Sequence, residues 1–182
     1  MKKLFVISGS SGVGKGTVIK EFLTKHPDFK LSISCTTRGM REGEVHGENY
    51  FFLSKEEFQK CVDNGEFLEW AEFSGNYYGT KRSFVEECLN KDENVILEID
   101  TKGALNVKSL MPEAVLIFIA PPSVEELEVR LRGRHTETED AIQKRLASIK
   151  FEIANSKKFD YQIVNDTVEN AVKQIENIIC SF

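Results

Sequence analysis

The sequence predicts an α/β domain with a mostly parallel sheet and a smaller β-rich segment inserted into it. Short apolar runs rich in β-branched residues alternate with stretches of helical periodicity, which is the pattern of parallel strands joined by helices. A glycine-rich turn directly follows the first of these runs. The alternation is interrupted between about residues 34 and 83, where glycines are closely spaced.

Four apolar runs are expected to form buried parallel strands. They are Leu4–Ser8, Val95–Ile99, Val115–Ala120 and Tyr161–Val164. Ser54 and Ser123 are each followed three residues later by Glu, so each is expected to begin a helix with a capping box. Near the C-terminus, one helical stripe predicts a helix that packs on the sheet. Its members are Val168, Val172, Ile175 and Ile179.

The inserted segment is expected to contain short strands at Asn49–Leu53, Phe67–Phe73 and Asn76–Tyr78, with one helix near Lys55–Asp63. A second irregular segment, from Arg132 to about Glu139, is polar and arginine-rich and is expected to be a mobile flap between two helices.

Composition narrows the class of protein. The 182 residues suit one domain with a sizeable core, and 41% apolar with 29% charged residues is ordinary for a soluble protein. The formal charge of -5 argues against nonspecific binding to nucleic acid or an anionic membrane. No run approaches the roughly 18 apolar residues of a membrane span, and no signal peptide is recognisable. Scattered cysteines and histidines predict reduced thiols in the cytoplasm and no metal cluster.

The glycine-rich turn has the spacing of a phosphate-binding loop, with four residues between Gly9 and Gly14 and then Lys15. Backbone N–H groups of such a loop, together with the positive end of the following helix, hold a di- or triphosphate. The alternative is a chance glycine-rich turn between a strand and a helix. The residues predicted to bind the nucleotide here are Gly9, Ser10, Ser11, Gly12, Val13, Gly14, Lys15, Gly16 and Thr17.

Gly16 stands where these loops usually place a Ser or Thr that binds Mg²⁺. We therefore expect Mg²⁺ to be held mainly by water and phosphate oxygens, and Thr17 to hydrogen-bond an inner phosphate. The Gly-Lys-Gly-Thr ending resembles nucleoside monophosphate kinases more than switch GTPases, so a phosphate acceptor site is expected elsewhere in the chain.

The inserted segment offers residues for that acceptor. Arg38 and Arg41 share one tight loop, and paired guanidinium groups suit a monophosphate; a solvated basic loop is the alternative. Tyr50 and Tyr78 could each add a hydroxyl donor. The carboxylate of Glu69 could accept from the N1–H and amino groups of guanine, although Glu69 taken by itself fits a surface acid better than a residue that recognises a base.

Taken together, these motifs make the chain similar to a guanylate kinase over residues 4 to about 175. After the loop they run S-x-T-T-R-x-x-R-x-G-E, F-L-E-W-A, G-N-x-Y-G-T, L-E-I-D, L-R-x-R-x-T-E-T-E and V-N-D. The resemblance implies ATP- and Mg²⁺-dependent phosphorylation of GMP or dGMP. It also implies a P-loop three-layer α/β/α core (1–33, 84–131 and 146–182), a GMP-binding insert (34–83) and a small lid (132–145).

The resemblance also assigns residues to roles. Guanine would be surrounded by Ser34, Glu69, Thr80 and Asp100. The GMP phosphate would be held by Arg38, Arg41, Tyr50 and Tyr78, with Glu44 beside them. The transferring phosphoryl group would be contacted by Lys15, Arg41, Arg134 and Arg145, and ATP also by Arg130 and Asn165. Departures from the usual family pattern occur at Ser10, Gly39-Met40 and Lys102.

Three alternatives remain at this level. The chain could phosphorylate AMP, UMP, dTMP or a sugar phosphate, against which the acidic residues and the Tyr-rich insert speak. It could be a non-catalytic guanylate-kinase-like module that binds phosphopeptides, although such modules typically lose the ATP loop. A GTPase switch is disfavoured by Gly16 and by the lack of an N-K-x-D stretch. The oligomeric state is not predicted.

Overall fold

The computed structural model describes residues 3–73, 75–123, 125, 128, 132 and 139–182, with the backbone alone for residues 140, 141, 144 and 145. The chain divides into two compact units. One unit comprises Met1–Val6 and Asp28–Val115, and the other comprises Ile7–Pro27 and Leu116–Phe182.

The larger sheet has five strands in the order β2-β7-β1-β8-β9. β2 pairs parallel with β7, Leu31 opposite Ile96, and β8 pairs parallel with β9, Phe118 opposite Gln162. The predicted mostly parallel α/β fold is therefore confirmed, and all four expected strands are present. Short, half-polar β2 is an additional strand that the apolar-run criterion missed. The bounds are β1 Leu4–Gly9, β2 Lys30–Ser32, β7 Val95–Glu98, β8 Val115–Ala120 and β9 Tyr161–Val164.

A second, mixed sheet lies in the first unit, with four strands in the order β4-β3-β6-β5. β5 has the expected bounds, β6 is three residues longer than expected, and the expected strand Asn49–Leu53 is reduced to β4. Cys35, Phe58 and Phe67 form the apolar cluster between this sheet and α2. The bounds are β3 Cys35–Thr36, β4 Phe51–Phe52, β5 Phe67–Phe73, β6 Asn76–Lys81 and α2 Lys55–Asp63.

The first unit contains three described helices, and side chains cap two of them. The predicted capping box of α2 is confirmed, because Ser54 accepts from the amide of Glu57 and the Glu57 carboxylate accepts from the amide of Ser54. α3, Arg82–Asn90, follows β6 directly, and α4, Thr101–Leu110, is capped by Asp100, whose side chain accepts from the amide of Gly103. The second expected capping box, Ser123 to Glu126, extends outside the described residues.

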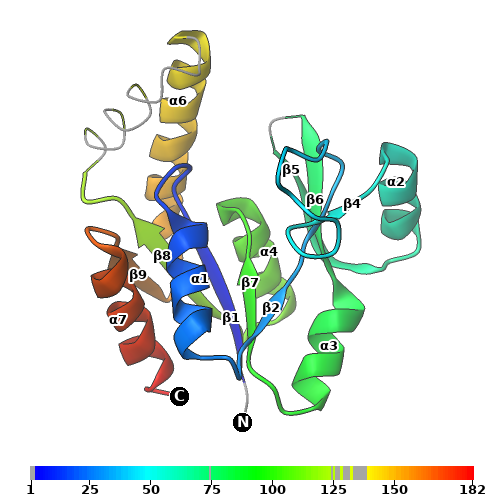
Figure 1. The fold of residues 1–182 in the computed structure, drawn as a ribbon, viewed down its shortest axis with the longest axis horizontal. Helices are drawn as coiled ribbons and strands as arrows, with labels where there is room; N and C mark the ends of the chain where they lie inside the picture. Colours follow the sequence, from blue (N-terminus) through cyan, green and yellow to red (C-terminus); the bar gives the residue numbers. More distant parts are fainter. Residues whose placement is uncertain (1–2, 74, 124, 126–127, 129–131, 133–138) are drawn as a thin grey trace. The chain divides into compact units, whose positions relative to one another are not determined.

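The second unit contains α1, Lys15–Lys25, α6, Glu139–Ser156, and α7, Val168–Ile179. α7 packs against α1 and β9, and Figure 1 shows α1 in blue beside α7 in red. Val172 and Ile175 of the expected stripe are fully buried, which confirms that α7 covers this part of the core. Among the described helices, none combines the length and apolar character that a membrane crossing requires.

Candidate active site

The turn after β1 has the backbone of a phosphate-binding loop. Gly12 and Gly14 have φ angles of 81° and 90°, in the left-handed region that favours glycine, and Gly14 is the N-cap of α1. A Cβ on Gly9 would lie 2.5 Å from the carbonyl oxygen of Ile119, so the loop passes too close to β8 for any side chain there. The predicted context of the motif, a strand before it and a helix after it, is confirmed.

The first half of the loop is held by the protein itself. The amide of Ser10 donates to the Ile119 carbonyl at 3.3 Å, and that of Val13 to the Ser10 carbonyl at 3.0 Å. The amide of Ser11 donates to Oε2 of Glu152 at 3.1 Å. By contrast, Gly12, Gly14, Gly16 and Thr17 are exposed. The first turn of a helix has N–H groups without intrahelical acceptors, which makes the second half of the loop suited to an anion.

Asn165 also contributes to the loop. It is buried, and its side-chain amide donates to the Val13 carbonyl at 2.7 Å. Its Nδ2 would also be 3.0 Å from a Cβ on Gly14, which is a second reason for glycine at that position. Asn165 therefore braces the loop, while its expected contact with ATP stays a prediction.

In the first unit, three of the residues expected around guanine lie on neighbouring strands. Glu69 of β5 pairs with Thr80 of β6, and Oγ1 of Thr80 donates to Oε1 of Glu69 at 2.8 Å. Ser34 comes directly before Cys35, which pairs with Gly79 on the other side of β6. The strand order β3-β6-β5 thus brings Ser34, Thr80 and Glu69 into one row.

The fourth expected residue, Asp100, faces Glu69 from the start of α4. Glu69 is only 7% exposed, and burial raises its pKa to about 7; the Thr80 hydrogen bond lowers the pKa, and the nearby Asp100 charge raises it. A Cβ on Gly103 would lie 2.6 Å from Oε2 of Glu69, so the first turn of α4 is closely packed on the carboxylate. The site therefore concentrates hydrogen-bond acceptors in a largely dehydrated place.

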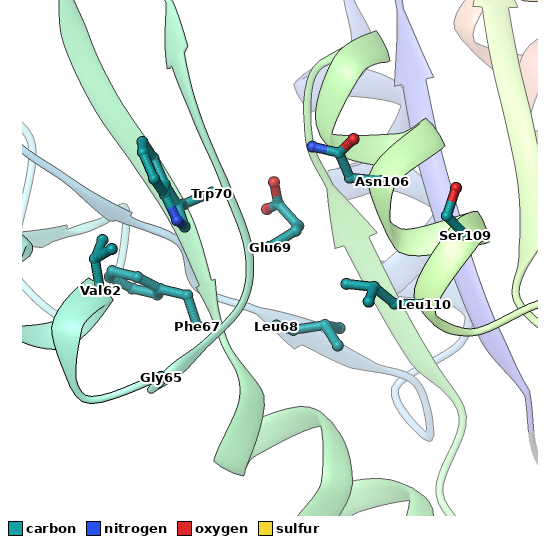
Figure 2. A pocket seen from close by; sticks show the side chains of 9 residues that line it. All are labelled: Val62, Gly65, Phe67, Leu68, Glu69, Trp70, Asn106, Ser109 and Leu110. Carbon is teal, nitrogen blue, oxygen red and sulfur yellow. The ribbon is translucent and has the colours of Figure 1, made fainter.

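A cavity of about 480 Å³ lies beside this carboxylate, between β5 and α4. Figure 2 shows Glu69 and Leu68 directed toward the helix, with the apolar side chains of Val62, Phe67 and Trp70 farther from it. The other lining residues are Gly65, Asn106, Ser109 and Leu110.

The predicted arginine loop is folded around Glu44. The carboxylate of Glu44 accepts from both terminal nitrogens of Arg38, at 2.7 and 3.0 Å, and from the amide of Arg41 at 2.8 Å. These bonds, first of all the one from Arg38, lower the pKa of Glu44. Arg38 lies 5.3 Å from the centre of the Tyr50 ring, and the Tyr50 and Tyr78 rings are 6.1 Å apart. Arg38, Tyr50 and Tyr78 are thus together. The backbone of Arg41 lies beside them, and Arg41 is exposed.

The expected lid arginines are described only in part. Arg130 and Arg134 lie outside the described residues, and Arg145 is described by its backbone alone, within α6. Arg132 forms ion pairs with Glu128 and Glu139. Lys15 is the first residue of α1, as the loop motif requires.

Two residues near the site were not anticipated from the sequence. Gly103 is explained by its contact with Glu69, but a glycine in a helical stretch gives no such signal by itself. Glu152 contacts the loop from 141 positions away, and no local pattern could have shown this.

Comparison with known proteins extends these findings. A guanylate kinase family model matches residues 1–181. A guanylate kinase from Prochlorococcus marinus subsp. pastoris is 51% identical over 100% of this chain and 98% of its own length. One from Clostridioides difficile is 50% identical over 98% of this chain and 87% of its own length.

Two solved structures are similar to this chain. The guanylate kinase from Anaplasma phagocytophilum is 35% identical, with a TM-score of 0.83, over 99% of this chain and 85% of that one. A shikimate kinase from Bacteroides thetaiotaomicron has a TM-score of 0.52 at 15% identity, covering 97% of this chain and 98% of that one, and shares the fold alone.

A glycine-rich phosphate loop at the end of a parallel strand, in a fold that matches a solved guanylate kinase at 35% identity, defines a P-loop kinase. The buried carboxylate of Glu69 and the arginine loop form a second candidate site, in the first unit. The chain belongs to the guanylate kinase family.

Proposed function

We propose that this chain transfers the γ-phosphoryl group of ATP to GMP, giving ADP and GDP. The observation that carries the proposal is the buried carboxylate of Glu69, positioned by Thr80 and close to Asp100. Guanine presents donors at N1 and at its amino group, whereas adenine presents a lone pair at N1. A buried acid with a second, half-buried acid beside it would therefore complement guanine and leave adenine unpaired.

ATP is held by the glycine-rich loop. The exposed second half of the loop and the start of α1 would bind its phosphates, with Lys15 on the outer ones. Arg130 and Asn165 complete the expected contacts with ATP.

Mg²⁺ accompanies ATP and neutralises charge on its phosphates. In the described part of the chain there is no group of three or more His, Cys, Asp or Glu side chains that could hold a metal ion. Gly16 also lacks a hydroxyl. The residues present therefore fit an ion bound by phosphate oxygens and water, which suits the hydration preference of Mg²⁺.

The GMP phosphate is the partner of the arginine loop. Arg38 and Arg41 neutralise it, Tyr50 and Tyr78 donate hydroxyl groups, and Glu44 keeps Arg38 in place. Because this phosphate is already an anion, it attacks without a general base. Protein side chains therefore act by aligning the two nucleotides and cancelling charge, through Lys15, Arg41, Arg134 and Arg145.

We place the reaction in the cytoplasm, where the four cysteines, all free in the structure, would stay reduced. The net charge of -5 makes nucleic acid and anionic membranes unsuitable partners. dGMP is included as an acceptor because none of the assigned contacts involves the ribose 2′-hydroxyl.

The test is an assay of ADP production from ATP and Mg²⁺ with GMP, dGMP, AMP, UMP or dTMP as acceptor. Rapid turnover with GMP, at least about 10³-fold above AMP in kcat/KM, is expected for a site that hydrogen-bonds its substrate's donors. Preference for another acceptor would indicate a different monophosphate kinase. A folded protein that binds GMP but produces no ADP would support the non-catalytic module instead.

A further inference from the structure

We propose that Glu152 is a positioning residue that holds the phosphate loop in its nucleotide-binding shape. The assignment of ATP as the ligand rests on the proposed function. Glu152 lies on α6, and its Oε2 accepts the amide hydrogen of Ser11 at 3.1 Å. Neither the glycine motif nor the resemblance to guanylate kinases gives this residue a role.

The environment of Glu152 argues for a specific purpose. The residue is only 7% exposed, and burying a carboxylate is strongly unfavourable unless hydrogen bonds replace its water. One oxygen is satisfied by the loop, and the other accepts from the hydroxyl of Ser148, one helical turn earlier, at 3.4 Å. An amide hydrogen bond to an ionised carboxylate is about twice as strong as one between neutral groups.

The position of this bond within the loop explains what it does. Ser10 and Val13 donate to backbone carbonyls, and Asn165 holds the Val13 carbonyl, so the residues on both sides of Ser11 are fixed. Glu152 fixes Ser11 itself. A negative charge beside a triphosphate site opposes binding by repulsion. A carboxylate is therefore better explained there by the order it gives to the loop than by a direct contact with nucleotide.

The same side chain links the loop to α6. Arg145, the predicted catalytic arginine, precedes Glu152 by seven residues on this helix, which corresponds to about 10 Å along the axis. Both the loop and α6 belong to the second unit. Glu152 therefore fixes the loop that would bind the ATP phosphates relative to the helix that carries Arg145.

Three variants test the proposal: Glu152→Ala, Glu152→Gln and, as a matched control, Glu176→Gln. Gln keeps an oxygen acceptor for Ser11, and its amide can donate to the Ser148 hydroxyl. Glu176 is another acid of the second unit, but it contacts His26 at 2.9 Å and not the loop. The measurements are kcat, KM for ATP and for GMP, binding of a nonhydrolysable ATP analogue, melting temperature and hydrogen exchange of the Ser11 amide.

Loss of one hydrogen bond to a charged group should raise the ATP KM of Glu152→Ala about tenfold, with the GMP KM changed by less than about twofold. Exchange at Ser11 should accelerate, Glu152→Gln should restore both properties, and Glu176→Gln should match the wild type. Unchanged Ser11 exchange and ATP KM in Glu152→Ala would overturn the proposal. So would equal increases in both KM values together with a lower melting temperature, or a Gln variant as impaired as Ala.

The exchange and analogue-binding measurements do not need turnover. If the wild-type chain made no GDP, the proposed function would fail, while these two readouts would still decide whether Glu152 orders the loop.

Discussion

The carboxylate of Glu69 combines burial with hydrogen bonding. Burial favours its neutral form, and the hydroxyl of Thr80 favours its charged form, as the donors of a bound guanine would in the proposed function. With a pKa of about 7, the free site is close to evenly divided between the two forms at neutral pH. Binding of guanine should select the charged form, because a protonated carboxyl group loses acceptor capacity.

We predict that GMP affinity increases as the pH rises through about 7 and that binding releases up to one proton near or below that pH. Calorimetry in buffers of different ionisation enthalpy would count the protons. Glu69→Gln should bind more weakly and lose this pH dependence. An affinity that is flat from pH 6 to 8 in the wild type would contradict the prediction.

Base selectivity provides a second test of the same residue. Gln at position 69 can accept only through its carbonyl and places an amino group near the donors of guanine. We expect Glu69→Gln to narrow the GMP over AMP preference in kcat/KM by at least about 100-fold. Glu72→Gln is the matched control, because Glu72 is an exposed acid on the same strand. An undiminished preference in Glu69→Gln would show that guanine is recognised elsewhere.

At the scale of elements, the sequence predicted best where the signal is local. The apolar runs located β8 and β9 with their observed bounds, and the capping box at Ser54 located α2. Short strands were missed, because two or three residues with mixed polarity, as in β2 and β3, carry no periodicity.

In the candidate site, too, features with a local sequence signal were predicted and features that depend on long-range packing were not. The glycine loop is a local motif, so its residues could be read directly. The contact between Glu69 and Gly103 depends on the packing of β5 against α4, and the contact between Ser11 and Glu152 depends on that of the loop against α6. Neither contact has a counterpart in sequence spacing.

α4 offers a prediction at this scale. In Gly103→Ala, the new Cβ would lie 2.6 Å from Oε2 of Glu69 and should displace the carboxylate, although alanine favours the helix itself by up to about 1 kcal/mol. We expect the GMP KM to rise about tenfold or more while the ATP KM stays near wild type. Lys102→Ala is the control, because Lys102 is exposed on the same helix. Equal GMP KM values in both variants would contradict this prediction.

At the scale of the whole molecule, the ionisation of Glu69 makes the free energy of unfolding depend on pH. Its folded-state pKa is raised above the unfolded value of about 4.5, so its favourable contribution is complete below that value and is lost as pH rises through about 7. The loss amounts to at most about 3 kcal/mol of unfolding free energy. Carboxylates with lowered pKa values, such as Glu66 and Glu139, titrate below this window.

We therefore predict that the wild type loses stability relative to Glu69→Gln between pH 5 and 8. Urea unfolding of both proteins across this range would measure the difference. Saturating GMP at pH 8 should increase the unfolding free energy of the wild type, because GMP binds only the folded protein. The increase should be smaller for Glu69→Gln, which is expected to bind GMP more weakly. Parallel stability profiles for the two proteins would exclude Glu69 as the titrating group.

The contact between Arg38 and Glu44 also bears on the entropic cost of binding GMP in the proposed function. A long cationic side chain that sampled many rotamers would have to lose that freedom during each encounter with GMP. Here the guanidinium is already clamped by a carboxylate from its own loop and flanked by Tyr50. In the proposed function, the phosphate of GMP would meet a guanidinium that is already ordered before binding, so the entropic cost of ordering Arg38 should be small.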